Sequence, residues 1–240
     1  MKKIILDLCG GTGSWSRPYK EAGYEVHNIT LPKFNVLYTA FDKEYHLINF
    51  AGKLILDAKD IYGILSAPPC TYFSYARTNA KKPRDLDGAF EIVHACLKVV
   101  WFCQQFLDKD TQKYPALNFW VLENPRFGML SWYLGKPAYE FDPWEFGDAY
   151  KKRTALWGYF THPEKQFDHI EQVLTKEQIE KHKTNSQPLP KFDYMKSKDI
   201  HPEHFGKLDR QTRRAITPKG FAEAFFKANN KEILDNIDAL

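Results

Sequence analysis

The chain has 240 residues, of which 43% are hydrophobic and 15% aromatic, enough for a sizeable core and an argument against wholesale disorder. Its net charge of +4 is compatible with a nucleic-acid partner but does not argue for one. No apolar run approaches the roughly 18 residues that a membrane span needs. The start, Met1–Ile4, lacks the hydrophobic stretch of a signal peptide. We therefore expect no membrane contact and a cytoplasmic location.

The four cysteines are Cys9, Cys70, Cys96 and Cys103. They form no Cys-x-x-Cys pair and have no His-x-x-x-His partner, so no metal site is predicted. In a reducing compartment their thiols stay free. Cys96 and Cys103 lie in an apolar, helix-like stretch, which is typical of core packing. Cys70 instead follows an apolar, strand-like run and is the cysteine to consider for chemistry.

Strand-like and helix-like segments alternate in the first half of the chain. This pattern is typical of an α/β fold in which helices cover both faces of a mostly parallel sheet. In chain order the sequence predicts a strand over Ile4–Leu8, a helix over Ser16–Ala22, strands over Glu25–Ile29, His46–Phe50, Lys53–Asp57 and Ile61–Ser66, a helix over Asp85–Leu107, strands over Ala116–Leu122 and Thr154–Tyr159, and helices over Thr175–Lys183 and Pro218–Asn229. Ala51-Gly52 favours a hairpin between the two strands that flank it, and Asp85 offers an N-cap.

Residues 161–205 differ in composition from the rest of the chain, being rich in Lys, Glu, His, Gln and Pro. They are too few to form a large core of their own. We therefore expect a main domain over residues 1–160, a small insert over 161–205 and a C-terminal segment over 206–240 that returns to the main domain. Within the insert, Thr175 and Gln178 fit a helix capping box.

A glycine-rich run, Asp7-Leu8-Cys9-Gly10-Gly11-Thr12-Gly13, separates the first predicted strand from the first predicted helix. Glycines at such a turn let the backbone approach a ligand closely. The run is neither a Gly-x-Gly-x-x-Gly nucleotide loop nor a Walker loop, which would need Gly-Lys-Ser/Thr. A cofactor-binding turn and a tight turn without a ligand are both open interpretations.

Two further runs follow predicted buried strands. Pro69-Cys70-Thr71-Tyr72-Phe73-Ser74 comes after the strand Ile61–Ser66, and Glu123-Asn124-Pro125 comes after the apolar run Phe119–Leu122. A thiol and a carboxylate at the ends of two neighbouring strands can attack and protonate a pyrimidine ring. A buried, inert thiol at Cys70 and a capping carboxylate at Glu123 are the structural alternatives.

Together and in this order, the three runs resemble the cytosine-5 DNA methyltransferase family, whose signatures include Pro-Cys-x-x-Phe-Ser and Glu-Asn. The resemblance covers roughly residues 1–158 and 206–230. It implies a Rossmann-like methyltransferase fold, S-adenosylmethionine as the cofactor and DNA as a partner. The main domain would then be the catalytic and cofactor-binding domain, and the insert would stand in place of a target-recognition domain.

The implied reaction is methyl transfer to carbon 5 of cytosine. Carbon 5 is a poor nucleophile, and addition of a thiolate to carbon 6 makes it enamine-like, so the attacking group must be soft and ionisable. The resemblance assigns Cys70 as this nucleophile and Glu123 as the acid that stabilises N3. Asn124 would brace Glu123 or the base.

The resemblance also implies a set of cofactor-binding residues: Asp7, Leu8, Cys9, Gly10, Gly11, Thr12, Gly13, Thr30, Asn35 and Pro68. Thr30 stands near the position of an acid that binds the ribose hydroxyls in the family. Asn35 stands where a third strand usually ends in an Asp that accepts from the adenine amino group. Both keep hydrogen-bonding capacity but lose the charge, and a plain loop role is open for each. Cys9 stands where the family commonly has Phe against the adenine.

Other family patterns are present only in part. Lys151–Ala155 aligns with Gln-x-Arg-x-Arg, which orients the base through its O2, and only Arg153 matches in full. A solvated basic turn is the alternative there. The basic stretch between Phe73 and Asp85 corresponds to a loop that closes over a flipped base, where cations suit phosphate contacts. Arg214 stands where the last motif usually has Asn.

The insert is much smaller than the target-recognition domain of family members that read a sequence. It leaves little surface for reading several base pairs, so we expect a very short target site or a protein partner that supplies recognition. Two alternative functions remain open. One is the same chemistry on RNA or on a free pyrimidine nucleotide. The other is a catalytically silent module that binds nucleic acid or cofactor on this scaffold.

Overall fold

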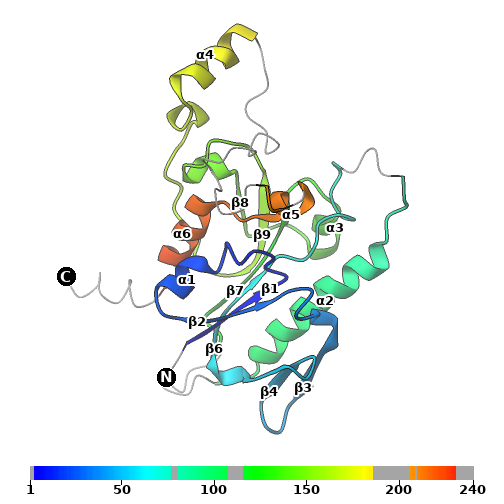
Figure 1. Ribbon diagram of the computed structural model, residues 1–240. Coiled ribbons are helices and arrows are strands. Elements are labelled where there is room, and N and C mark those ends of the chain that lie inside the picture. Colours follow the sequence, from blue (N-terminus) through cyan, green and yellow to red (C-terminus); the bar gives the residue numbers. More distant parts are fainter. Residues whose placement is uncertain (1–2, 77–80, 108–115, 186–205, 209, 231–240) are drawn as a thin grey trace, which may run out of the picture.

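A six-stranded sheet forms the centre of the computed structural model, which describes residues 3–76, 81–107, 116–185, 206–208 and 210–230 (Figure 1). The strand order is β2-β1-β6-β7-β9-β8. The strands are β1 (Ile4–Leu8), β2 (Glu25–Ile29), β6 (Ile61–Ser66), β7 (Phe119–Pro125), β8 (Tyr139–Phe141) and β9 (Thr154–Tyr159). The strands β2, β1, β6 and β7 run parallel to one another, and β9 runs antiparallel to its two neighbours, β7 and β8. The expected α/β fold with a mostly parallel sheet is confirmed.

A second, three-stranded antiparallel sheet lies between β2 and β6 in the chain. It consists of β3 (Thr39–Asp42), β4 (Leu47–Phe50) and β5 (Leu54–Asp57). The predicted hairpin is confirmed as β4 and β5, and its turn places Ala51 and Gly52 at φ values of 53° and 70°. The strand β3 was not predicted.

The helices are α1 (Arg17–Glu21), α2 (Leu86–Cys103), α3 (Leu130–Leu134), α4 (Lys176–Asn185), α5 (Arg210–Ala215) and α6 (Lys219–Ala228). Short 3-10 helices are η1 (Val36–Tyr38), η2 (Ala58–Asp60), η3 (Pro143–Phe146) and η4 (Ile170–Gln172). The helix α2 begins as predicted, because the Asp85 side chain accepts a hydrogen bond from the Gly88 N–H at 3.0 Å. It ends earlier than the predicted Leu107.

Helices cover both faces of the sheet, as the sequence predicts. Side chains alternate along β1, so its two faces pack against different helices. Leu6 and Leu8 share a core cluster with Val99 of α2. Ile5, on the opposite face, shares a cluster with Phe221 of α6, and Figure 1 shows α6 beside α1 on that side. Each such large apolar side chain contributes about 1.5–3 kcal/mol when fully buried.

The strand β7 differs from its predicted bounds. It begins at Phe119 instead of Ala116 and continues past Leu122 to Pro125. The physical reason is β9, whose antiparallel ladder pairs Glu123 with Leu156 and continues to Pro125. On its other side β7 pairs with β6 only as far as Leu122. The last three residues of β7 therefore extend beyond β6.

The insert is described only as far as residue 185. There the predicted capping box is confirmed: the Gln178 N–H donates to Thr175 Oγ1 at 3.2 Å, and the Thr175 N–H donates to Gln178 Oε1 at 2.8 Å. Figure 1 shows α4 standing apart from the central sheet. Residues 186–205 lie outside the described part, so the domain boundaries stay a prediction. Across the described ranges, no helix combines the length and apolar character needed to cross a membrane.

Candidate functional site

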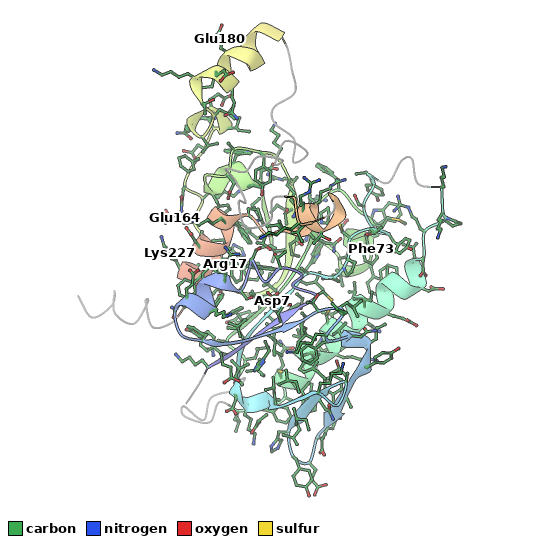
Figure 2. The ribbon with its side chains drawn as sticks, in the orientation of Figure 1. Asp7, Arg17, Phe73, Glu164, Glu180 and Lys227 are labelled. Carbon is green, nitrogen blue, oxygen red and sulfur yellow. The ribbon has the colours of Figure 1, made fainter. Side chains whose placement is uncertain are left out.

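The three sequence motifs meet at one edge of the sheet. The neighbouring strands β1, β6 and β7 are parallel, so their carboxyl ends lie at the same edge. Leu8 pairs with Ser66, and Ser66 pairs with Leu122. The loop after β1, the loop after β6 and the end of β7 therefore lie side by side. Figure 2 shows Asp7 near the centre of the molecule and Phe73 to one side, toward α2.

Asp7 is a fully buried carboxyl group that fixes the start of the glycine turn. The Ser16 hydroxyl donates to Asp7 Oδ2 at 2.6 Å, linking the end of β1 to the start of α1. Asp7 Oδ1 has no hydrogen-bond partner among the described residues. Burial raises the pKa of Asp7 from 3.8 to about 6, against the lowering effect of Ser16. A Cβ on Gly10 would collide with the Asp7 carboxyl group, so this position requires glycine.

The backbone of the turn has a left-handed conformation at several positions. Cys9, Gly11 and Gly13 have φ values of 58°, 54° and 71°. The Cys9 side chain packs against the core on the α2 face, and Leu8 is buried within it. Gly11 is exposed, with no atom near the position of a Cβ, so a ligand could approach its backbone. Thr12 Oγ1 lies 2.6 Å from the Ser14 hydroxyl.

Asn28 in β2 supports this turn and was not among the predicted site residues. Its Nδ2 donates to the Gly11 carbonyl oxygen at 3.0 Å. Its Oδ1 is buried and has no partner among the described residues. The sequence feature that could have pointed to Asn28 is a polar amide near the end of the predicted strand Glu25–Ile29. Asn28 thus joins β2 to the turn, and it lies two residues before the predicted Thr30.

Thr30 and Asn35 lie in the connection between β2 and β3. Thr30 is half-buried, and its carbonyl oxygen accepts from the Phe34 N–H at 2.9 Å. No strand ends at Asn35. Its Oδ1 instead accepts from the Leu37 N–H at 3.1 Å and caps η1. One acceptor site of Asn35 is therefore already used within the protein.

A buried hydrogen bond joins the second and third motifs. Asn124 Nδ2 donates to the carbonyl oxygen of Pro68 at 3.0 Å. Pro68 thus contributes a backbone acceptor, two residues before Cys70. Within the turn, the N–H groups of Phe73 and Ser74 donate to the Cys70 carbonyl oxygen at 3.0 and 2.9 Å. The Cys70 side chain is half-buried at this turn.

Arg84 and the segment after β7 both donate hydrogen bonds to the turn that carries Cys70. Arg84 Nη1 donates to the carbonyl oxygens of Tyr72 and Ser74 at 2.5 and 3.0 Å. On the other side, the Met129 N–H donates to the Phe73 carbonyl oxygen at 2.9 Å. Phe73 itself is fully buried in a cluster with residues of α2 and β9. These contacts fix the turn that carries Cys70.

Cys70 and Glu123 share one electrostatic environment. Burial raises the pKa of the Cys70 thiol, and the neighbouring Glu123 raises it further, whereas Lys152 and Arg214 lower it. Burial also raises the pKa of Glu123, and Lys152 opposes that shift. The charges of Glu123 and Lys152 therefore both affect the pKa of Cys70, and Lys152 also affects the pKa of Glu123. Sequence reasoning did not assign Lys152 a role, because only its neighbour Arg153 matched the family pattern.

Arg153 forms ion pairs with the carboxylates of β8 and η3. Its Nη2 lies 3.5 Å from Glu140 Oε2, and its Nη1 lies 3.4 Å from Asp142 Oδ2 and 4.0 Å from Glu145 Oε2. Arg126 contacts Glu140 as well, at 2.5 Å. The predicted base-orienting role of Arg153 stays a prediction. The cation that influences both Cys70 and Glu123 is Lys152.

No match to the chain is found among protein-family models or among curated proteins. In the described part of the chain, no three His, Cys, Asp or Glu side chains form a group that could hold a metal ion. The residue types at the strand ends and their geometry therefore indicate what chemistry the site can perform. A thiol beside a carboxyl group with a raised pKa can add to an unsaturated ring and protonate it.

Proposed function

We propose that this protein is an S-adenosylmethionine-dependent methyltransferase that acts on carbon 5 of cytosine in DNA. One observation carries the proposal: the pairing of β6 with β7 brings Cys70 and Glu123, far apart in the sequence, to the same edge of the sheet. The charge of Glu123 there raises the pKa of the thiol. The bond from Asn124 to Pro68 holds the two motifs together. The runs that supply these groups resemble the signatures of cytosine-5 methyltransferases.

The chemistry that we propose begins at carbon 6 of the ring. The Cys70 thiolate forms a bond from Sγ to carbon 6, and the electrons of the carbon 5–carbon 6 double bond move into the ring. Glu123 donates its proton to N3, which accepts the developing charge. Carbon 5 becomes nucleophilic and takes the methyl group from the sulfonium of the cofactor, whose carbon–sulfur bond would break to leave a neutral thioether. Loss of the carbon 5 proton to a base, return of the N3 proton to Glu123 and cleavage of the bond to Sγ then restore the ring, the acid and the thiolate.

The charges around the two groups are suited to these roles. Burial raises the pKa of Glu123, so its carboxyl group holds a proton at a higher pH than an exposed Glu, as an acid for N3 requires. Burial and Glu123 raise the pKa of Cys70, which disfavours the thiolate. Lys152 and Arg214 act in the opposite direction, and we assign them the role of stabilising the thiolate.

The turn after β1 has features that fit S-adenosylmethionine. Its backbone is accessible at Gly11, and Asn28 has a buried oxygen without a partner among the described residues. We assign cofactor binding to the backbone of Cys9–Gly13 and to Thr30. Asn35 could contribute only the acceptor capacity left by its bond to Leu37. When bound, the cofactor would supply an electrophilic methyl group.

The test is transfer of a tritiated methyl group from S-adenosylmethionine to DNA. Wild-type protein should incorporate label at cytosine, and Cys70→Ala should not. With DNA that contains 5-fluorocytosine, which cannot lose a proton from carbon 5, the wild-type protein should form a covalent adduct that survives denaturing electrophoresis. The control Cys103→Ala removes a buried core thiol and should keep the adduct. Undiminished incorporation by Cys70→Ala would refute the mechanism.

A further inference from the structure

Three exposed aromatic residues form a patch beside the candidate site. The side chains of Tyr75, Phe127 and Trp132 are 43%, 68% and 77% exposed. The rings of Tyr75 and Trp132 lie 6.2 Å apart, and the Tyr75 N–H donates to the Phe127 carbonyl oxygen at 3.3 Å. Single exposed aromatic residues are ordinary, whereas a contiguous group of them marks an interaction surface. We call these three residues the aromatic patch.

The aromatic patch is built from the same segments as the candidate site. Tyr75 follows the turn that carries Cys70, and Phe127 follows the segment that carries Glu123. A bridge between Ser74 and Gly128 joins the two segments. Figure 1 shows α3, which contains Trp132, beside the chain that leads from β6 to α2. A ligand on the patch would therefore be continuous with a ligand at Cys70.

A series of ring contacts connects α3 to the buried core. The ring of Tyr133, next to Trp132 in α3, lies 4.4 Å from that of Phe90. Phe90 in turn lies 5.0 Å from the buried Phe73. Trp132 itself projects into solvent, so its ring is available without any rearrangement of the core. Rigid aromatic surfaces of this kind lose little conformational entropy on binding.

Several cations flank the patch in the chain. Lys81 and Lys82 are exposed just before Arg84, whose guanidinium contacts the Ser74 carbonyl oxygen beside Tyr75. Lys136 is exposed just after α3. The segment of Lys81 and Lys82 also carries two acids, Asp85, which is the N-cap of α2, and the exposed Asp87 in the first turn of α2. Aromatic rings interspersed with cations match the bases and phosphates of an unpaired nucleic-acid strand.

We infer that the aromatic patch stacks unpaired bases of a single-stranded nucleic acid on either side of the nucleotide that enters the candidate site. The placement of that nucleotide beside Cys70 rests on the proposed function, but the stacking requires no cytosine. A single strand is favoured over a duplex because stacking on protein rings needs free base faces, which a duplex buries. Every base has such a face, so little sequence-reading surface is needed.

The test is a fluorescence anisotropy titration with labelled oligothymidylate, which contains no cytosine, and with a duplex of the same length. The wild type should bind the single strand more tightly than the duplex. Trp132→Ala should weaken single-strand binding roughly tenfold, because stacking contributes about 1–3 kcal/mol per base. Trp132→Phe keeps a ring and should retain most of the affinity. The control Trp101→Ala, at another exposed tryptophan on α2, should bind like the wild type.

The same titrations separate this inference from the proposed function. Binding of oligothymidylate that depends on Trp132 supports the patch even if no methyl transfer is found. If methyl transfer depends on Cys70 but Trp132→Ala binds the single strand like the wild type, the patch inference is wrong and the proposed function stands. A concentration-dependent dimer that Trp132→Ala abolishes, without any oligothymidylate binding, would assign the patch to a second copy of the chain and overturn the inference.

Discussion

Asn124 donates a side-chain hydrogen bond to the Pro68 carbonyl oxygen, and this contact joins β7 to the turn that carries Cys70. It lies where the ladder between β6 and β7 has ended, because β6 pairs with β7 only as far as Leu122. Beyond Leu122, the side-chain hydrogen bond from Asn124 to Pro68 therefore connects β7 to the segment after β6, where backbone pairing between the strands has ended. We infer that it fixes the separation between Cys70 and Glu123.

Asn124→Ala should destabilise the protein and expose Cys70. It leaves the buried Pro68 carbonyl oxygen without its donor, which costs about 1–3 kcal/mol in the free energy of unfolding. Urea denaturation measures this loss, and the rate of Cys70 alkylation by iodoacetamide should rise as the turn loosens. Asn118→Ala is a matched control, since the Asn118 side chain makes a local bond to the Ala116 carbonyl oxygen at 3.3 Å and no other side-chain bond among the described residues. Equal effects of the two substitutions would contradict a special role for Asn124.

Lys152→Met should make the Cys70 thiol less reactive at neutral and mildly alkaline pH. Burial and Glu123 raise the pKa of Cys70, and Lys152 is the largest influence that lowers it. Without the ammonium group less thiolate is present at any given pH, so alkylation should be several-fold slower and its pH profile should move to higher pH. The profile of iodoacetamide reaction rates against pH measures this.

Lys151→Met provides the control for Lys152→Met. Lys151 is exposed next to Lys152 and is not among the groups that act on Cys70. Its substitution removes the same charge from the chain but should leave the alkylation profile unchanged. If both substitutions move the profile equally, the effect is one of net charge and not of Lys152 at the site.

Asp7→Asn should stabilise the protein at neutral pH. In the folded state burial raises the pKa of Asp7 from 3.8 to about 6, so between these values the folded protein holds a proton that the unfolded chain has released. The stability of the wild type therefore falls as the pH rises through this window and stays low above it. Two pKa units correspond to about 3 kcal/mol, the upper limit of the expected gain at pH 7.

Urea denaturation of Asp7→Asn across the acid and neutral range measures this difference. Its advantage over the wild type should disappear below about pH 4, where both unfolded and folded Asp7 are protonated. The exposed Asp87→Asn is the control and should show no comparable advantage. An Asp7→Asn protein that is less stable than the wild type at pH 7 would mean that the carboxylate has a stabilising partner.

Arg153→Met should lower stability without affecting Cys70. It removes the cation from between Glu140, Asp142 and Glu145, of which Glu145 is buried. Glu140 keeps its pair with Arg126 and Glu145 keeps its pair with Lys165, so Asp142 loses its cation and the other two lose one of two. This should cost about 1–3 kcal/mol at neutral pH. The loss should shrink in acid, where Asp142, whose pKa is raised by burial and lowered by Arg153, becomes protonated.

The matched control for Arg153→Met is Lys219→Met, which breaks the exposed pair with Glu223 at 3.8 Å and should cost less than about 1 kcal/mol. Denaturation and Cys70 alkylation are measured on the same samples. If Arg153→Met moves the alkylation profile as Lys152→Met is expected to, then Arg153 also acts on the thiol, and the division of roles between these neighbours is wrong.

Much of the fold follows from local patterns. The strands Ile4–Leu8, Ile61–Ser66 and Thr154–Tyr159 have their predicted bounds, because each is a short and mostly apolar run. Glu25–Ile29 is more polar, and its bounds are set by Gly23 before it and the run up to Pro32 after it. The short strand β8 and the one-turn helix α3 were not predicted. Their sequences are too short to show a period, and they exist because β9 and the turn at Phe73 offer partners.

The sequence by itself determined which chemical groups stand after which strands: a glycine turn after β1, a thiol after β6 and a carboxyl group near the end of β7. Only the tertiary structure decided which cation lies close enough to the thiol and the carboxyl group to lower their pKa values. Lys152 and Arg153 are adjacent, and the composition of the run cannot distinguish them. The pairing of β9 with β7 and β8 brings Arg153 to three carboxylates and leaves Lys152 to act on Cys70 and Glu123. Charge acts through space, so neighbours in the chain can belong to different sites.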